Sequence, residues 1–178
     1  MQFEIKNYRG FNRTDFKNFL LGGDIGGTNT RLGLFGIRNK WPQLLTSLHF
    51  KSQELTSLSS AINKVLEYFY KNYKVNLSKA SIAAAGPLSS DREQVSITNV
   101  KWSIDKNDLV KNTKLRKVIL LNDFEAIGYG LNMISSTDVK TIKHAKKMPK
   151  APIVLIGAGT GLGKATLIYD THTHYYSP

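Results

Sequence analysis

Two glycine-rich turns are the segments of this sequence best suited to chemistry. The first reads Gly23-Asp24-Ile25-Gly26-Gly27-Thr28-Asn29, and the second reads Gly157-Ala158-Gly159-Thr160-Gly161-Leu162-Gly163. Such turns expose backbone N–H groups, and two of them facing each other could hold the phosphate chain of a nucleotide. One turn alone is more simply a hairpin that needs glycine for positive φ. Two matching turns favour phosphate binding.

Neither turn matches the common phosphate-binding loops. A Walker A loop needs Gly six residues before its Lys and Ser or Thr after it, whereas Lys164 has Ala158 and Ala165 at these positions. A dinucleotide fingerprint from Gly157 would need glycine at position 162 and would open a helix. Position 162 is Leu, and the residues that follow resemble a strand. Both turns therefore belong to strand–turn–strand units, each typical of the opening hairpin of a structural repeat.

Two carboxylates accompany the turns. Asp24 lies at the end of the strand before the first turn, where a carboxylate beside phosphate needs a cation, so we expect it to hold Mg²⁺ through water. The alternative is a turn Asp that caps backbone N–H groups. Asp123 follows Asn122 at the carboxyl end of a predicted strand, where open α/β sheets bind ligands. It could accept the proton of an attacking hydroxyl, or simply cap the helix that begins there.

Hydrophobic periodicity places these residues in a mixed α/β domain. It predicts a hairpin over 19–25 and 31–37 and a long helix over 55–73, with Thr56 and Ser57 as available N-caps. It also predicts strands over 44–50, 81–85, 94–98, 118–121, 153–156 and 165–169 and helices over 105–112 and 124–134.

The composition excludes several classes of protein. The chain has 178 residues, 41% of them hydrophobic, and it contains no cysteine, so it carries no disulfide and no thiolate metal site. Its charged N-terminus does not fit a signal peptide or a membrane span, and we expect a cytoplasmic protein with no membrane partner. The net charge is +12, but no basic groove interleaved with aromatics and no nucleic-acid motif accompanies it. We therefore expect no nucleic-acid partner.

Taken in order, these motifs resemble the bacterial-type glucokinase family. The resemblance rests on the first turn through Leu32, on Leu121-Asn122-Asp123-Phe124-Glu125-Ala126 and on the second turn, with Ala85-Gly86-Pro87 and Thr98-Asn99 in the expected order. It covers roughly residues 18–178. It implies the N-terminal lobe of the actin-like ATPase (ribonuclease H-like) fold, a mixed sheet with flanking helices, and the start of a second lobe at the C-terminus.

The resemblance also implies a site for ATP, Mg²⁺ and glucose or a similar hexose. Two loops would bind ATP: Gly23, Asp24, Ile25, Gly26, Gly27, Thr28 and Asn29 in the first, and Gly159, Thr160, Gly161 and Gly163 in the second. Asp24 would organise Mg²⁺ through water. Asp123 would draw the proton from the sugar 6-hydroxyl, and Asn122 would hydrogen-bond the sugar. Asn99, Gly86 and Pro87 would shape the sugar pocket.

Family members continue well past the second glycine turn, where a sugar-binding segment and a lobe carrying the adenine pocket follow. We therefore expect an N-terminal fragment with little activity of its own, from a full-length protein that could be a homodimer. The expected domains are an unmatched extension over 1–18, a small α/β lobe over 19–150 and the first hairpin of a truncated second lobe over 151–178.

Two alternatives stay open. The first is a non-catalytic sugar- or nucleotide-binding module derived from a sugar kinase, although a pure sensor does not need Asp123. The second is a sugar kinase of the ROK group. The wording of the Asn122-Asp123-Phe124-Glu125 segment favours the glucokinase group, and the zinc-binding cysteines of the ROK group cannot exist in this chain.

Overall fold

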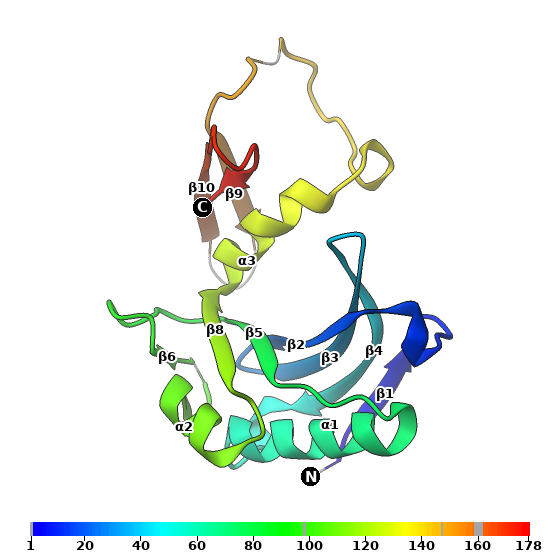
Figure 1. The fold of residues 1–178 in the computed structure, drawn as a ribbon. Coiled ribbons are helices and arrows are strands. Elements are labelled where there is room, and N and C mark those ends of the chain that lie inside the picture. Colours follow the sequence, from blue (N-terminus) through cyan, green and yellow to red (C-terminus); the bar gives the residue numbers. More distant parts are fainter. Residues whose placement is uncertain (1, 98, 147, 159–161) are drawn as a thin grey trace. The chain divides into compact units, whose positions relative to one another are not determined.

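A six-stranded mixed sheet with helices on one face forms the first part of the chain (Figure 1). The structure, a computed structural model, describes residues 2–97, 99–146, 148–158 and 162–178. Contacts between Cα atoms divide the chain into two compact units, Met1–Asn122 and Asp123–Pro178. Each unit is described by itself.

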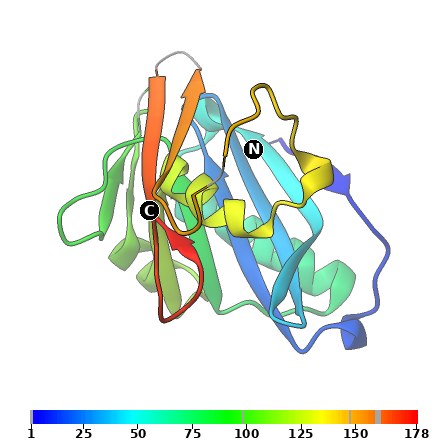
Figure 2. The ribbon, with the colours of Figure 1, turned by 90° about the horizontal axis from the view of Figure 1, so that it is seen from above.

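The sheet of the first unit joins an antiparallel half to a parallel half. Its strand order is β1-β4-β3-β2-β5-β8, and β2, β5 and β8 run parallel to one another. Figure 2 shows the long antiparallel strands β2 to β4 from above. The strands are β1 (Glu4–Asn7), β2 (Asn18–Ile25), β3 (Asn29–Arg38), β4 (Trp41–Lys51), β5 (Lys79–Ala84) and β8 (Lys117–Asn122).

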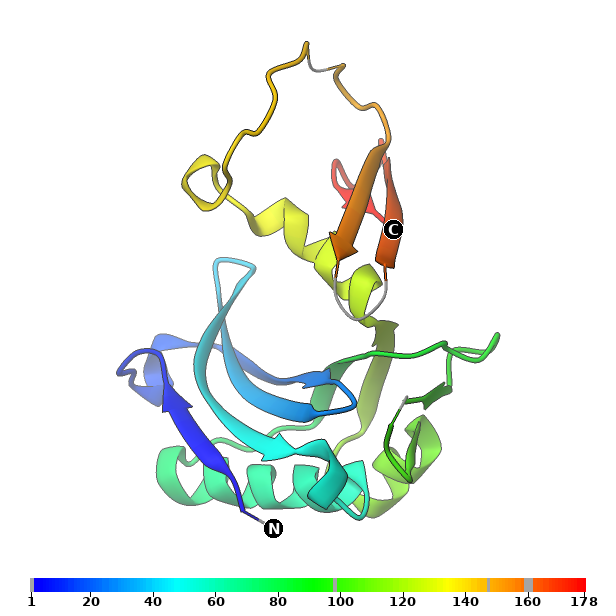
Figure 3. The ribbon, with the colours of Figure 1, turned by 180° about the vertical axis from the view of Figure 1, so that it is seen from behind.

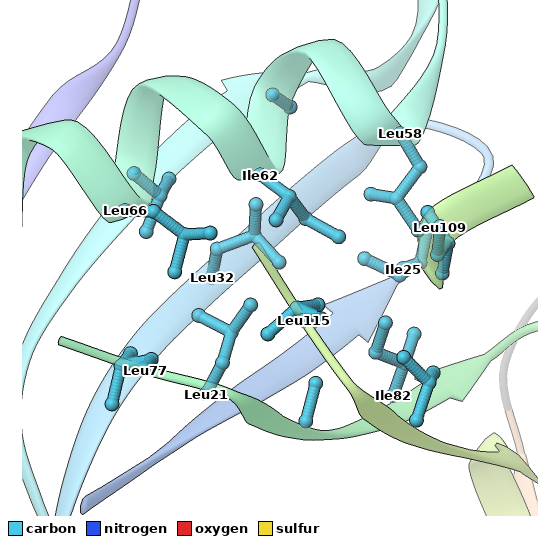
Figure 4. Close-up of a cluster of buried hydrophobic side chains, with 14 of the residues drawn as sticks. Leu21, Ile25, Leu32, Leu58, Ile62, Leu66, Leu77, Ile82, Leu109 and Leu115 are labelled. Atoms are coloured by element: carbon cyan, nitrogen blue, oxygen red, sulfur yellow. The ribbon is translucent and has the colours of Figure 1, made fainter. Parts of the chain in front are cut away.

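Helix α1 (Leu58–Tyr73) lies along one face of this sheet, as Figure 3 shows. Ser57 is its N-cap, with the side chain accepting a hydrogen bond from the backbone N–H of Ser60. Apolar residues at helical spacing turn one stripe of α1 toward the sheet. They pack on leucines and isoleucines of β2, β3 and β5 (Figure 4), including Leu21, Leu32 and Ile82, which are fully buried.

Smaller elements complete the first unit. A two-stranded sheet consists of β6 (Gln94–Ser96) and β7 (Ser103–Asp105) and leads into α2 (Lys106–Asn112). Asp105 caps α2, because its carboxylate accepts hydrogen bonds from the N–H groups of Asn107 and Asp108. Single 3-10 turns, η1 (Arg13–Asp15) and η2 (Ser52–Glu54), lie before β2 and after β4.

The second unit is a short helix against an antiparallel sheet. Its strands are β9 (Ile153–Ala158), β10 (Leu162–Tyr169) and β11 (Tyr176–Ser177), in the order β11-β10-β9. Helix α3 (Asp123–Gly130) packs on β10 at Gly128, where a Cβ would lie 2.7 Å from the Leu167 side chain. Two 3-10 turns follow α3, η3 (Leu131–Met133) and η4 (Ser136–Asp138).

The structure confirms the predicted helices and strands in outline and adds β7 and β11, which the periodicity did not predict. The helix predicted over 124–134 ends at Gly130 and continues as the 3-10 turn η3, since Gly128 and Gly130 lower its helix propensity. Strand β1 lies within the extension that the periodicity left without structure. Residues 123–150 belong to the same compact unit as the β9–β10 hairpin. None of the described helices is long and apolar enough to span a membrane.

Candidate active site

Three parallel strands end in register at one edge of the sheet, and the predicted sugar and phosphate residues of the first unit lie there. Ile25 of β2 is opposite Ala84 of β5, which is opposite Asn122 of β8. Beyond these ends, the Nδ2 atom of Asn122 donates to the carbonyl oxygen of Gly86 at 3.2 Å. The N–H of Ala85 donates to the carbonyl oxygen of Ile25 at 2.9 Å. The start of the first turn, the Gly86 corner and Asn122 are thus joined by hydrogen bonds.

The Gly86-Pro87 corner is closely packed on the small β6–β7 sheet. A Cβ at Gly86 would overlap the backbone carbonyl of Ser96, which cannot move aside as a flexible side chain could, so this position requires glycine. Asn99 lies in the exposed turn between β6 and β7, where its φ is 67°. Two of the predicted pocket positions, 86 and 99, therefore belong to one local structure. Thr98, which accompanies Asn99 in the motif, lies outside the described residues.

Ser52, a residue that sequence reasoning missed, holds the first glycine turn in place. Its hydroxyl donates to the carbonyl oxygen of Gly26 at 2.6 Å, and its N–H donates to the carbonyl oxygen of Thr28 at 2.9 Å. Its side chain is fully buried and also lies 2.8 Å from the Thr30 hydroxyl. The indole N–H of Trp102 donates to the carbonyl oxygen of Ser52 at 3.1 Å. The backbone of the turn is therefore held at Gly26 and Thr28, and such preorganisation would lower the cost of binding a ligand there.

The predicted Mg²⁺ residue, Asp24, lies on β2 directly opposite Arg31 of β3. The two side chains form an ion pair at 2.8 Å, with 59% of the Asp24 and 53% of the Arg31 side chain exposed. An exposed carboxylate suits a magnesium ion that keeps most of its water, and Arg31 would compete for it. Within the described residues, no group of three acidic or histidine side chains could hold a metal ion.

In the second unit, Asp123 is the first residue of α3 and is half-buried. Its Oδ1 atom accepts a hydrogen bond from the N–H of Phe124 at 2.9 Å. This bond satisfies one of the helix's free N-terminal N–H groups, in keeping with the capping alternative. The two roles are compatible, because a carboxylate has two oxygens and four lone-pair sites.

The ring of Phe124 lies against the hairpin that carries the second glycine turn. Gly157 and Gly163 are opposite each other in β9 and β10. A Cβ at Gly157 would lie 2.6 Å from a Phe124 ring atom, and one at Gly163 would overlap the same ring. These two glycines therefore make room for an aromatic ring, which fixes the start of α3 on the strands leading to the turn. Gly159, Thr160 and Gly161 lie outside the described residues.

In the described part of the chain, the turn glycines are not explained by a backbone conformation that only glycine adopts readily. None of the glycines there has a positive φ, so the alternative of a hairpin that needs glycine for positive φ does not explain Gly23, Gly26 or Gly163. At Gly23, a Cβ would instead lie 3.3 Å from Ile82 of β5. Close packing across the sheet accounts for glycine there.

Comparison with known proteins identifies the family. The family model described as Glucokinase matches residues 21–178. The glucokinase of Nostoc sp. (strain PCC 7120 / SAG 25.82 / UTEX 2576) is 34% identical over 160 residues, which are 89% of this chain and 46% of that protein. A crystal structure of glucokinase from an Antarctic psychrotroph has a TM-score of 0.75 at 25% identity, over 89% of this chain and 48% of that one.

A second solved structure, glucokinase from Balamuthia mandrillaris in complex with glucose, has a TM-score of 0.72 at 25% identity, over 90% of this chain and 46% of that one. The chain thus spans about half the length of the relatives it matches. Its architecture is the N-terminal lobe of the actin-like ATPase fold, with a mixed sheet and flanking helices. By the match of its motifs, its fold and 158 consecutive residues, 21–178, the chain belongs to the glucokinase family.

Proposed function

We propose that the protein transfers the γ-phosphoryl group of ATP to the 6-hydroxyl of glucose or a similar hexose, and that this chain supplies the sugar-side residues and the first phosphate loop. The observation that carries the proposal is the carboxyl edge of the sheet, where Asn122 is hydrogen-bonded to the Gly86 corner. Asp123 follows Asn122 directly in the chain. The names of the relatives, one of them solved with glucose, support the substrate class.

In the proposed reaction, the oxygen of the sugar 6-hydroxyl bonds to the γ-phosphorus of ATP, and Asp123 accepts the proton that this hydroxyl loses. The bond from that phosphorus to the bridging oxygen breaks, and ADP leaves. The amide of Asn122 hydrogen-bonds the sugar and orients it. The first loop, residues 23–29, binds phosphate oxygens through its turn between β2 and β3, which Ser52 holds at Gly26 and Thr28. Residues 159, 160, 161 and 163 form the second loop. Mg²⁺, held by Asp24 through water, would neutralise the charge that develops on the phosphates.

The 178-residue chain alone is expected to show little turnover. It spans about half of its relatives, and a water-excluding site cannot close without the second lobe. The test is an assay of glucose-dependent ADP formation, run on this chain and on a fusion of it to the remaining C-terminal part of the Nostoc glucokinase. We expect activity in the fusion, and a loss of at least 100-fold in kcat with Asp123→Asn, in line with the usual worth of a general base.

The control for the fusion is Asp138→Asn, an exposed carboxylate elsewhere in the second unit, which should leave activity unchanged. Full activity of Asp123→Asn would refute the base, and glucokinase-like kcat from the 178-residue chain alone would refute the need for a second lobe. Calorimetry with glucose and with ATP separately tests the non-catalytic alternative. Binding of either ligand by an inactive fusion would favour it.

We also propose a cytoplasmic location, where ATP and hexoses meet, and a homodimer for the full-length protein. Size-exclusion chromatography with light scattering on the fusion tests the dimer. A monomer at all concentrations would contradict it.

A further inference from the structure

The first unit carries a cavity of about 820 Å³ at the strand ends opposite to the candidate active site. Lys79 and Lys117, the first residues of β5 and β8, line it, whereas Ala84 and Asn122 at the other ends belong to the candidate site. Five residue steps along a strand separate the two ends, or about 16 Å. The volume is in the range of pockets that bind small molecules.

The cavity is strongly cationic. Arg13, Lys17, Lys79 and Lys117 line it, and none of its lining residues is acidic. Lys79 and Lys117 are opposite each other on adjacent strands, so their side chains share one face of the sheet, where neighbouring like charges are unfavourable. Among the described residues, none of these four cations has an acidic partner within ion-pair distance. The lining of the cavity therefore carries four positive charges and no negative charge, so an anionic ligand would be favoured there.

The nearest carboxylate in sequence is already engaged. Asp15, between Arg13 and Lys17, accepts the N–H of Asn12 at 2.8 Å in the 3-10 turn η1 and is not among the lining residues.

The floor of the cavity is apolar. Leu20 of β2, Ile37 of β3 and Ile119 of β8 line it together with Phe16 and Phe19. Ile119 lies on the edge strand β8 and is 48% exposed, so its side chain is accessible to a ligand in the cavity. A ligand with an apolar body would bury this surface while its anionic end met the lysines. The hydroxyl-bearing residues Thr14, Ser78 and Ser81 complete the lining and supply further polar groups.

The segment before residue 21 builds one wall of the cavity. Arg13, Lys17 and Phe16 all precede the first residue that the family model matches. This wall is well fixed, because Phe16 and Phe19 pack on Phe11 with ring centroids 6.1 and 6.4 Å away, and Phe11 packs on Tyr73 of α1 at 5.1 Å. The cavity therefore includes residues that lie before the part of the chain matched by the family model.

We infer that this cavity is a second ligand site, which binds a small organic phosphate: a phosphate monoester carrying an apolar body. The doubly charged phosphate lies between Lys79 and Lys117, with Arg13 and Lys17 on the other wall, and the apolar body lies on Ile119 and its neighbours. The inference does not depend on the proposed kinase activity, because it uses no residue of the candidate active site.

The test is calorimetric titration of the 178-residue chain with phenyl phosphate. The double variant Lys79→Ser, Lys117→Ser should bind at least tenfold more weakly. The matched control is the double variant Lys140→Ser, Lys143→Ser, which replaces two exposed lysines of the second unit. Both double variants lower the net charge from +12 to +10. The control should bind phenyl phosphate as the parent chain does. Equal weakening in both double variants, or none in the first, would overturn the site.

Two further measurements keep the inference falsifiable. Inorganic phosphate should bind the parent chain at least tenfold more weakly than phenyl phosphate. Equal affinities would show that the apolar floor does not contribute to binding. The variant Arg13→Ser, Lys17→Ser, on the opposite wall, should also weaken phenyl phosphate binding at least fivefold, and unchanged binding would remove the extension from the site. Thermal melts of each variant establish that it is folded. This second pair replaces the first if Lys79→Ser, Lys117→Ser does not fold.

Discussion

At the residue scale, Phe124 connects the candidate base to the second glycine-rich hairpin. Asp123 and Phe124 are adjacent, and the ring of Phe124 occupies space left by Gly157 and Gly163. A shift of the hairpin would press on the ring and so on the first turn of α3. Two glycines that the sequence marks as part of a phosphate loop thus also act through packing, on the residue next to the proposed base.

Gly163→Ala should destabilise the second unit. The new Cβ would overlap the Phe124 ring, and overpacking of this kind costs about 1–3 kcal/mol. The measurement is hydrogen exchange of the β9 and β10 amides, which should become faster. Gly130→Ala is the control, because nothing lies within 4 Å of its Cβ position. Unchanged exchange in Gly163→Ala would show that the ring moves away freely.

His49 should make stability depend on pH. Its pKa is lowered, mainly by burial and further by the positive charges of Lys6 and Arg31. Below about pH 6.5 the unfolded chain binds a proton that the folded chain resists, so stability falls as the pH drops through that value. The variant His49→Gln should lose less stability between pH 7.5 and 5.5 than the parent chain, measured by guanidinium unfolding. Equal losses would contradict the shift.

At the scale of elements, the sequence predicts well those helices and strands whose apolar residues recur at a regular spacing. The hairpin of β2 and β3, the helix α1 and the strand that ends at Asn122 all match, because their apolar residues recur at strand or helix spacing. Strand β1 could not be found in this way, since all four of its residues are exposed and it forms only by pairing with β4. Ser52 could not be found either, because its role lies in contacts across the fold.

The N-cap of α1 offers a test of a single helix end. In Ser57→Ala, the N–H of Ser60 loses the hydroxyl that accepts it at 3.2 Å, which should lower the free energy of unfolding by about 1 kcal/mol. Chemical denaturation measures this loss. Thr56→Ala is the comparison, because the Thr56 hydroxyl lies near only another hydroxyl, that of Ser60, at 3.4 Å. If Thr56→Ala lowered the free energy of unfolding more than Ser57→Ala does, Thr56 and not Ser57 would be the N-cap.

At the scale of the molecule, the two units differ in how much apolar surface they bury. Every residue of the large hydrophobic core cluster lies in the first unit. In the described part of the second unit, Leu167 is the one buried hydrophobic residue, and Val154, Ile156 and Leu162 of its hairpin are more than 60% exposed. Since burial of apolar surface dominates stability, the first unit supplies most of it.

A chain ending at residue 122 should therefore fold by itself. We expect it to unfold cooperatively, with a midpoint close to that of the main transition of the full chain, because the core cluster is intact. Circular dichroism melts of both chains give this comparison. A non-cooperative melt of the shorter chain would show that the second unit stabilises the first.

The pairing of β1 with β4 has a consequence for solubility. Without β1, the eleven-residue strand β4 would be the edge of the sheet and would offer its unpaired backbone groups to other chains. With β1 present, the edge strand is β1 itself, which is only four residues long. It carries the charged residues Glu4 and Lys6, which discourage another strand from pairing with it. The N-terminal segment thus covers residues 46–49 of β4, which should lower the tendency of that strand to pair with another chain.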